Sequence, residues 1–351
     1  MIAFYSDFYF RQDHDQIFQN FIREFPMFDY VVQVRRIKDR FNFIRGLRMT
    51  GWDLCNLWLM RNVRISFRKK LSLIRVLGLT ALYYKRMGAY LHTKAYAYGL
   101  VYGDSNPYEN ILVQYMKRKG IYTGTLQHGL FDKRAYWRGL EYRTSVADDF
   151  LAWSEYIKDL AMECGMSEQK IKVLGIPRYI RPIKVKKEEK NHIFGVILGN
   201  REYDEENKRL IGFANRLAGD QGLKYRLRYH PNCKGDEYDR EVKEQFLVQA
   251  AKQKEEISEM CNACDFMLIG SGTSVIIDLI YLQQPFMQYT MHQDERKSKK
   301  RNNYFHNYEE LERLIQERDA LYNKEMFRYY CGTRDVKKSY AEYFKKMMAD
   351  F

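Results

Sequence analysis

The chain has 351 residues, 46% of them hydrophobic and 30% charged, a composition that excludes wholesale disorder. Six cysteines are too few for a disulfide scaffold, and 6 prolines with 21 glycines exclude collagen-like and low-complexity classes. The length favours about two domains, and the formal net charge is +14.

The first ten residues, MIAFYSDFYF, lack the basic start and the small-residue cleavage site of a secretory signal. No run approaches about 18 uncharged apolar residues, so no transmembrane helix is predicted. We therefore expect a protein of the reducing cytoplasm.

In chain order, the first half predicts short strands that alternate with helices. Strands are expected at residues 2–5, 97–102, 122–126, 150–154 and 172–174, and helices at 110–119 and 155–164. This alternation predicts a parallel sheet.

A strongly basic and mainly helical region, residues 35–86, interrupts this pattern. It holds 14 cations against two anions, Asp39 and Asp53, and so carries +12 of the net charge. Bulky residues such as Trp52 and Trp58 lie among the cations, a mixture that fits an anionic membrane surface. The same mixture fits nucleic-acid phosphates or a solvated helical face. No nucleic-acid motif accompanies it, so we expect a membrane-facing region and no nucleic-acid partner.

Residues 182–191, PIKVKKEEKN, are polar and begin with proline, which is typical of a linker. They predict an N-terminal domain of residues 1–181 and a C-terminal domain of residues 191–325. Residues 326–351 are expected to form a C-terminal helix that packs back on the N-terminal domain.

The second half alternates more regularly. Strands are expected at residues 192–198, 224–229, 265–269 and 285–289, helices at 205–217 and 274–282, and a polar helical stretch between Pro231 and Glu259. Both halves are therefore expected to be α/β, with doubly wound sheets whose ligands bind beyond the carboxyl ends of the strands.

The strongest local motif is the segment between the strand at 265–269 and the following helix. It consists of Gly270, Ser271, Gly272, Thr273 and Ser274. Glycines let the backbone approach a ligand, and exposed amides with hydroxyls at a helix start bind anions. The segment lacks the lysine of a P-loop, and a tight turn capped by Ser and Thr is the alternative.

A second motif, Arg228, Tyr229, His230 and Pro231, ends the strand at 224–229. A histidine at this place can donate to a phosphate oxygen or protonate a leaving group. We expect it to meet the glycine-rich segment at one edge of the sheet, with Asn200 at the end of the strand at 192–198.

Two further motifs end strands of the first half. Gln127, His128 and Gly129 follow one strand, and Gly103 with Asp104 follows another. Either His128 or Asp104 could act as a base. The alternative is that both are ordinary turn or helix-cap residues without a catalytic role.

Three weaker patterns remain, and we expect no bound metal from any of them. The pair Cys261 and Cys264 has metal-ligand spacing but lacks a second pair, so packing is the preferred interpretation. The triplet 13–15 (DHD) and the basic cluster 297–301 are read as ordinary surface.

Together these motifs, in this order, resemble bacterial GT-B glycosyltransferases of surface-polysaccharide synthesis. His230-Pro231 and Ser271 with Thr273-Ser274 are similar to the His-Pro and Ser/Thr motifs that hold the nucleotide phosphate in capsule-type sialyltransferases. The stretch from Gln127-His128-Gly129 to a Gly-x-Pro-Arg turn ending at Arg178 resembles that group and the CDP-glycerol glycerophosphotransferases. The acidic triplet that supplies the sialyltransferase base is absent, and Gly103-Asp104 is nearest in position.

The resemblance implies two Rossmann-like domains that face a cleft, and a glycosyltransferase that uses a nucleotide-sugar donor. It implies an inverting, metal-independent transfer to a lipid-linked or growing polysaccharide at the inner face of the cell membrane. In this scheme the donor is bound by Arg228, His230, Pro231, Asn200 and the segment 270–274, with Gln127, Gly129 and Arg178 elsewhere in the cleft. A glycerophosphotransferase, a sugar-nucleotide 2-epimerase and a nucleic-acid-binding protein stay open as alternatives.

Overall fold

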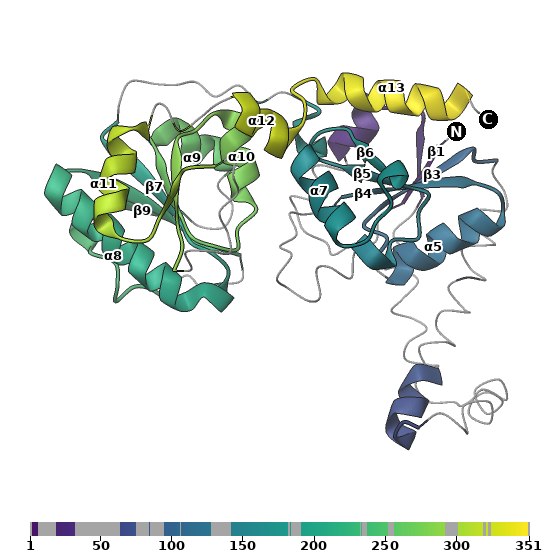
Figure 1. Ribbon diagram of the computed structural model, residues 1–351, viewed down its shortest axis with the longest axis horizontal. Coiled ribbons are helices and arrows are strands. Elements are labelled where there is room, and N and C mark those ends of the chain that lie inside the picture. The colour runs from purple at the N-terminus through teal and green to yellow at the C-terminus, as the bar shows by residue number, and fades with distance from the viewer. Residues whose placement is uncertain are drawn as a thin grey trace. The chain divides into compact units, whose positions relative to one another are not determined.

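The computed structural model describes residues 2–5, 19–31, 64–74, 84, 95–105, 107–127, 142–181, 183, 191–231, 233, 237–251, 256–291, 301–318, 321 and 324–349. The chain divides into two compact units, each built on a sheet with helices packed against it (Figure 1). Unit 1 comprises Met1–Ala152, Lys158–Ile180 and Asp335–Phe351, and unit 2 comprises Trp153–Ile157 and Arg181–Arg334.

The sheet of unit 1 has six parallel strands in the order β2-β1-β3-β4-β5-β6. They are β1 Ile2–Tyr5, β2 Phe28–Val31, β3 Tyr98–Tyr102, β4 Tyr122–Leu126, β5 Asp149–Ala152 and β6 Ile171–Val173. Helix α5, Pro107–Arg118, follows β3, and α7, Glu155–Glu163, follows β5. Glu109 in the first turn of α5 and Lys117 and Arg118 in its last turn match the helix dipole.

The C-terminal segment forms two helices where the sequence suggested one. Helix α12, Lys324–Cys331, lies within unit 2, and α13, Val336–Ala349, lies within unit 1. Gly332 separates them with φ of 74°, a left-handed conformation that stops a helix. In α13, Tyr340 and Phe344 are fully buried, and the Phe344 ring lies 5.0 Å from that of Phe28. The last helix therefore supplies part of the core of unit 1.

The sheet of unit 2 is also parallel, in the order β12-β11-β10-β7-β8-β9. Its strands are β7 Ile193–Ile197, β8 Lys224–Arg228, β9 Leu247–Ala251, β10 Met267–Ile269, β11 Phe286–Tyr289 and β12 Tyr304–Phe305. Its helices, besides α12, are α8 Asp204–Gln221, α9 Ile257–Ala263, α10 Val275–Leu282 and α11 Tyr308–Gln316. The prediction of two parallel α/β sheets is thus confirmed.

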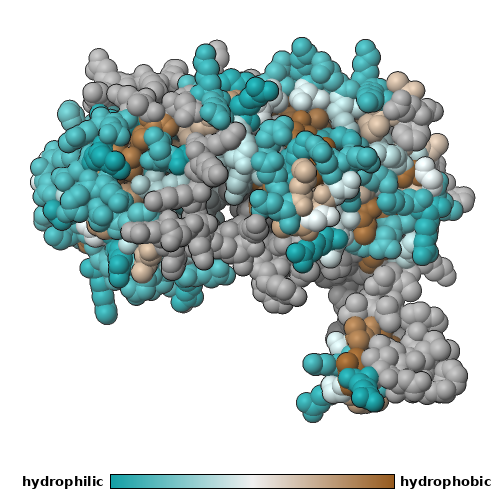
Figure 2. All heavy atoms as spheres, in the orientation of Figure 1, coloured by the Kyte–Doolittle hydropathy of each residue, from teal (hydrophilic) through white to brown (hydrophobic). Residues whose placement is uncertain are grey.

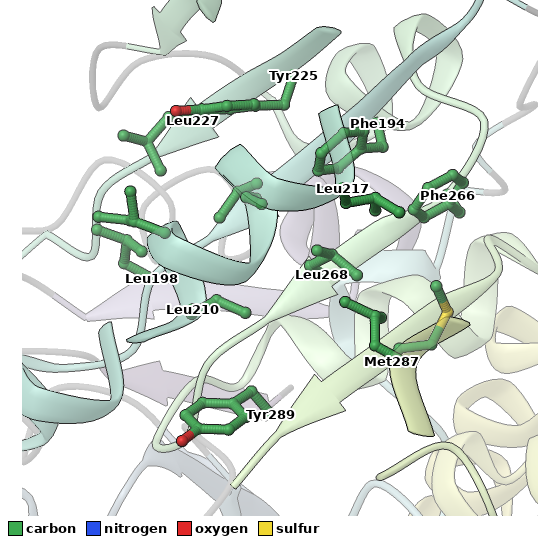
Figure 3. Close-up of a cluster of buried hydrophobic side chains, with 14 of the residues drawn as sticks. Phe194, Leu198, Leu210, Leu217, Tyr225, Leu227, Phe266, Leu268, Met287 and Tyr289 are labelled. Atoms are coloured by element: carbon green, nitrogen blue, oxygen red, sulfur yellow. The ribbon is translucent and has the colours of Figure 1, made fainter. Parts of the chain in front are cut away.

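The core of unit 2 lies between its sheet and α8. Side chains from neighbouring strands, including Phe194 and Phe266, meet Leu210 and Leu217 of α8 (Figure 3). The rings of Phe194 and Phe266 stack with centroids 5.2 Å apart. Burial of a large apolar side chain contributes about 1.5–3 kcal/mol, so this layer fixes the positions of the strand ends.

The helical stretch predicted between Pro231 and Glu259 is wrong over much of its length. Residues 247–251 form β9, which pairs with β8 across a register shift at Tyr225 and Arg226. As an edge strand, β9 leaves side chains such as Val248 exposed, and such a strand shows no alternation of apolar and polar residues. Hydrogen bonding to β8 therefore overrides the local helix propensity.

Candidate functional site

The strand order of unit 2 contains a reversal between β7 and β10. From β7 the chain proceeds outward to β8 and β9, and then returns to the other side of β7 with β10, β11 and β12. Ligands of doubly wound sheets bind beyond the carboxyl ends of the strands at such a point. The residues that follow β7 and β10 are therefore candidates for a ligand site.

The backbones after these two strands are in direct contact. A Cβ atom at Gly199 would overlap the carbonyl oxygen of Ser271, and one at Gly270 would lie 2.8 Å from the amide nitrogen of Gly199. The Gly270 amide donates to Ile197 O at 2.9 Å. Only glycine at both positions permits this approach, which brings the two loops together.

A buried asparagine holds the junction. Asn207 of α8 is fully buried, and its Oδ1 accepts a hydrogen bond from the Gly199 amide at 2.8 Å. Its Nδ2 donates to the Gly199 carbonyl at 3.2 Å and to the Tyr238 hydroxyl at 3.1 Å. Sequence reasoning missed Asn207 and Gly199, because their role depends on a contact between two strand ends.

The loop 270–274 presents a mixed set of groups. Ser271 is fully buried and donates to the Tyr289 carbonyl at 3.4 Å, and Thr273 Oγ1 accepts from the Val275 amide at 3.3 Å. Gly272 has φ of 71°, which side chains rarely adopt. Ser274 is exposed and makes no capping bond through its hydroxyl. The Ser274 hydroxyl, at the start of α10, is therefore accessible to solvent.

The second motif lies on the other side of β7. Arg228 and His230 are half-buried at the end of β8, Pro231 is exposed, and the Cys233 amide donates to His230 O at 2.8 Å. Because β7 lies between β10 and β8, its end places Asn200 between the glycine-rich loop and His230.

Buried polar groups also support the β8 side. The Tyr229 ring stacks on Tyr238 with centroids 6.2 Å apart, and Cys233 Sγ lies 3.7 Å from the Gly199 carbonyl. Burial raises the pKa of the Tyr238 phenol, and burial likewise raises the pKa of the Cys233 thiol. Both groups therefore stay protonated near neutral pH and provide hydrogen bonds without adding charge.

The carboxyl edge of unit 2 thus carries His230, a serine hydroxyl and the first turn of a helix, with Arg228 at the end of β8. Helix starts attract anions, and charged donors strengthen hydrogen bonds to them. The arrangement is chemically suited to a phosphate group.

In unit 1, the carboxylate of Asp104 accepts several hydrogen bonds from a neighbouring loop. Asp104 is buried, and its Oδ2 accepts hydrogen bonds from the Ser145 hydroxyl at 3.0 Å and from the amides of Val146 and Ala147 at 2.6 and 2.8 Å. Its own amide donates to Thr125 Oγ1 at 3.0 Å. Asp104 therefore fixes the loop 145–147 against the ends of β3 and β4.

A lysine at the end of the 3-10 helix Glu168–Lys170, directly before β6, supports the same loop. Lys170 Nζ donates to the Ser145 carbonyl at 2.7 Å. Burial lowers the pKa of Lys170, while the nearby Asp104 raises it in part. The loop is thus held by groups of both charges.

The other predicted residues of unit 1 are only partly described. Gln127 is buried directly after β4, and its backbone amide donates to Leu151 O at 3.2 Å. Arg178 is half-buried in the short 3-10 helix Pro177–Tyr179, which follows the turn at Gly175. His128 and Gly129 lie outside the described residues, so their predicted roles stay predictions.

Only some residues of the weaker patterns lie in the described ranges. Cys261 and Cys264 are buried free thiols, and burial raises the pKa of Cys261. Within the described ranges, no cluster of three or more His, Cys, Asp or Glu residues could hold a metal ion. The triplet 13–15 and residues 297–300 lie outside these ranges. Arg301 is buried, with its guanidinium over the rings of Phe286 and Tyr304.

No family model and no curated protein matches the sequence. Among solved structures, the chain is similar to MnaA of S. aureus in a co-structure with UDP (TM-score 0.61, 11% identity, 99% of this chain and 96% of that chain). It is also similar to a UDP-GlcNAc 2-epimerase from Neisseria meningitidis bound to UDP-GlcNAc (0.58, 13%, 98% and 99%). A third structure is the lipopolysaccharide outer core galactosyltransferase WaaB in its apo form (0.54, 16%, 98% and 99%).

These likenesses extend over nearly the whole chain at low identity, so they establish the fold. The chain has the GT-B fold, with two Rossmann-like α/β domains, as the resemblance implied. None of the helices in the described ranges combines the length and apolarity needed to cross a bilayer.

Proposed function

We propose that the protein is an inverting glycosyltransferase that moves a sugar from a nucleotide-sugar donor to a lipid-linked or growing surface polysaccharide. In this reaction the acceptor hydroxyl oxygen bonds to the anomeric carbon while the bond from that carbon to the phosphate oxygen breaks. The nucleotide leaves with the electron pair, and the hydroxyl proton passes to a base. The proposal requires no metal ion.

The observation that carries the proposal is the junction of Gly199 and Gly270 at the strand reversal of unit 2. It joins the ends of β7 and β10, and His230 and Arg228 follow the neighbouring strand β8. We infer that the loop 270–274, His230 and Arg228 together bind the donor phosphate. Preorganised donors of this kind stabilise charge that develops on a leaving phosphate. Structural neighbours with bound UDP and UDP-GlcNAc support a nucleotide-sugar ligand.

For the base we favour His128 over Asp104. The three hydrogen bonds to Asp104 Oδ2 favour a role in positioning the loop 145–147. His128 directly follows the buried Gln127 at the end of β4, the edge at which a ligand of unit 1 would bind. A positioned base of this kind typically contributes 10²–10⁴-fold to the rate, on the order of several kcal/mol.

The basic region 35–86 supports the proposal of a lipid-linked acceptor. In its longest described stretch, residues 64–74, the side chains of Phe67 and Leu73 are 65% and 43% exposed, and Arg64, Arg68 and Lys69 are exposed beside them. Figure 2 shows apolar and charged atoms side by side on this segment, at the lower right. Exposed apolar groups among cations fit an anionic bilayer surface better than they fit nucleic acid.

The test is a thermal-shift panel of CMP, CDP, UDP, UMP, GDP and ADP, with and without Mg²⁺. A ligand that binds only the native state stabilises it by about 2.7 kcal/mol at 100 times its dissociation constant. We expect a metal-independent shift with one nucleotide. In His230→Ala the affinity should fall by about tenfold to a hundredfold, because a hydrogen bond to a charged group is lost.

The pattern of shifts also separates the alternatives. A shift with CDP followed by glycerol phosphate transfer would replace the sugar donor with CDP-glycerol. Release of a 2-epimer from a UDP-sugar without any acceptor would replace transfer with epimerisation. No shift with any nucleotide, together with salt-sensitive polynucleotide binding, would overturn the proposal in favour of nucleic-acid binding.

A further inference from the structure

The loop 270–274 is contacted by an aromatic ring from the neighbouring strand end. Tyr203 belongs to the 3-10 helix Arg201–Tyr203, which follows β7 and leads into α8. A Cβ atom at Gly272 would overlap Tyr203 Cε2 and lie 2.8 Å from Cδ2 and 3.2 Å from Cζ. The phenol ring therefore lies directly on the backbone of Gly272, in the space where another residue would place its side chain.

The Gly270 amide anchors the start of the loop through its 2.9 Å hydrogen bond to Ile197 O, but the side-chain hydrogen bonds of the following residues are few and long. The hydroxyls of Ser271 and Thr273 make bonds of 3.4 and 3.3 Å, and Ser274 caps α10 without a side-chain bond. Two of the five residues are glycines, whose backbone is the least restricted. A binding loop of this kind keeps its geometry only if packing holds it.

Tyr203 is itself well anchored. Its amide donates to the Asn200 carbonyl at 2.8 Å, and the next residue, Asp204, begins α8, the helix that covers the core of unit 2. The side-chain hydrogen bond from Lys208 lowers the pKa of Asp204 and closes the first turn of α8. The ring therefore projects from an anchored element onto the backbone of the glycine-containing loop.

We propose that Tyr203 is a positioning residue that braces the loop 270–274 through Gly272. The ring fixes the peptide planes of Gly272 and Thr273, and thereby the direction of their amides and of the Ser274 hydroxyl. That these groups then face a donor phosphate rests on the proposed function. The brace itself does not.

The experiment combines hydrogen exchange of the free protein with nucleotide binding. In Tyr203→Ala we expect amides of residues 270–276 to exchange about tenfold faster, because the loop opens more often without the ring. In Tyr203→Phe, which keeps the ring, exchange should stay within about twofold of wild type. Tyr304→Ala removes another half-buried tyrosine of unit 2 and serves as the matched control, with no effect on these amides.

Binding of UDP, CDP, GDP and CMP, measured by calorimetry, provides the second readout. We expect Tyr203→Ala to bind the preferred nucleotide about tenfold more weakly, since the loop must be ordered on binding. Unchanged exchange in Tyr203→Ala, faster exchange throughout unit 2, or faster exchange in Tyr203→Phe would each overturn the brace. Local fast exchange in a protein that binds none of the nucleotides would support the brace and contradict the proposed function.

Discussion

At the scale of single residues, the proposed transfer needs a base, and Asp104 and His128 are the two candidates for it. Asp104 Oδ2 already accepts three hydrogen bonds from the loop 145–147. A carboxylate held in this way offers a structural anchor, whereas a base needs an accessible lone pair in reach of the acceptor hydroxyl. Substitution of Asp104 should therefore lower mainly the stability, whereas substitution of His128 should lower mainly the transfer rate.

We expect Asp104→Asn to lower the free energy of unfolding by about 2 kcal/mol, because charge-assisted hydrogen bonds in a buried position are weakened. Its transfer rate should stay within about tenfold of wild type, whereas His128→Ala should lose 10²–10⁴-fold, roughly the full contribution of a base. Urea denaturation and the pH profile of transfer measure the two effects. A large loss of rate in Asp104→Asn at unchanged stability would assign the base to Asp104.

The candidate site residues that the sequence singled out are those with a local signature. The glycine-rich segment 270–274 and the pair His230 and Pro231 stand out because glycine and proline restrict what the chain can do at a strand end. Asn207 and Tyr203 carry no such signature. Their importance arises only when the ends of β7 and β10 meet, a contact between residues about 70 positions apart in the sequence.

At the scale of elements, prediction succeeded where a segment is buried. The strands β7, β10 and β11 lie inside the sheet and show compact apolar runs. The strands β2, β9 and β12 were not predicted as strands. Each of them is the outermost strand at one edge of its sheet. Edge strands are held by hydrogen bonds to one neighbour, and this leaves little trace in the pattern of side chains.

At this scale, we expect the helical segment 67–74 to bind anionic membrane surfaces. Arg68→Ala with Lys69→Ala should weaken binding to vesicles rich in phosphatidylglycerol by about thirtyfold, since each cation contributes about 1 kcal/mol. The matched control is Lys345→Ala with Lys346→Ala on α13, two exposed lysines outside the basic region. Cosedimentation at low and high salt measures the effect. Equal losses for both pairs would mean that net charge, and not this segment, governs binding.

At the scale of the whole molecule, buried tyrosines are a shared property of both units. Burial raises the pKa of Tyr225 to about 12, and burial together with Asp149 raises that of Tyr122 to about 12. Burial also raises the pKa of Tyr98, Tyr289 and Tyr340. In the unfolded chain these phenols lose their protons near pH 10.

Because the folded state holds these protons more tightly, its advantage is fully present below pH 10 and is lost as pH rises toward 12. We expect tyrosinate absorbance to lag behind that of free tyrosine and then to rise together with the loss of circular dichroism. Tyr225→Phe should make the stability of unit 2 less sensitive to pH above 10. Full ionisation near pH 10 with an intact dichroism spectrum would contradict this expectation.

The division of the chain has a consequence for the order of synthesis. The sheet of unit 2 is encoded without interruption between Arg181 and Arg334, whereas unit 1 needs α13, which is synthesised after that sheet. Domains usually complete themselves in the order in which they are translated. Here the later unit can close first, while Phe21, Phe25 and Phe28 await the Phe344 ring. Until α13 arrives, the nascent chain displays an aromatic surface that a chaperone can recognise.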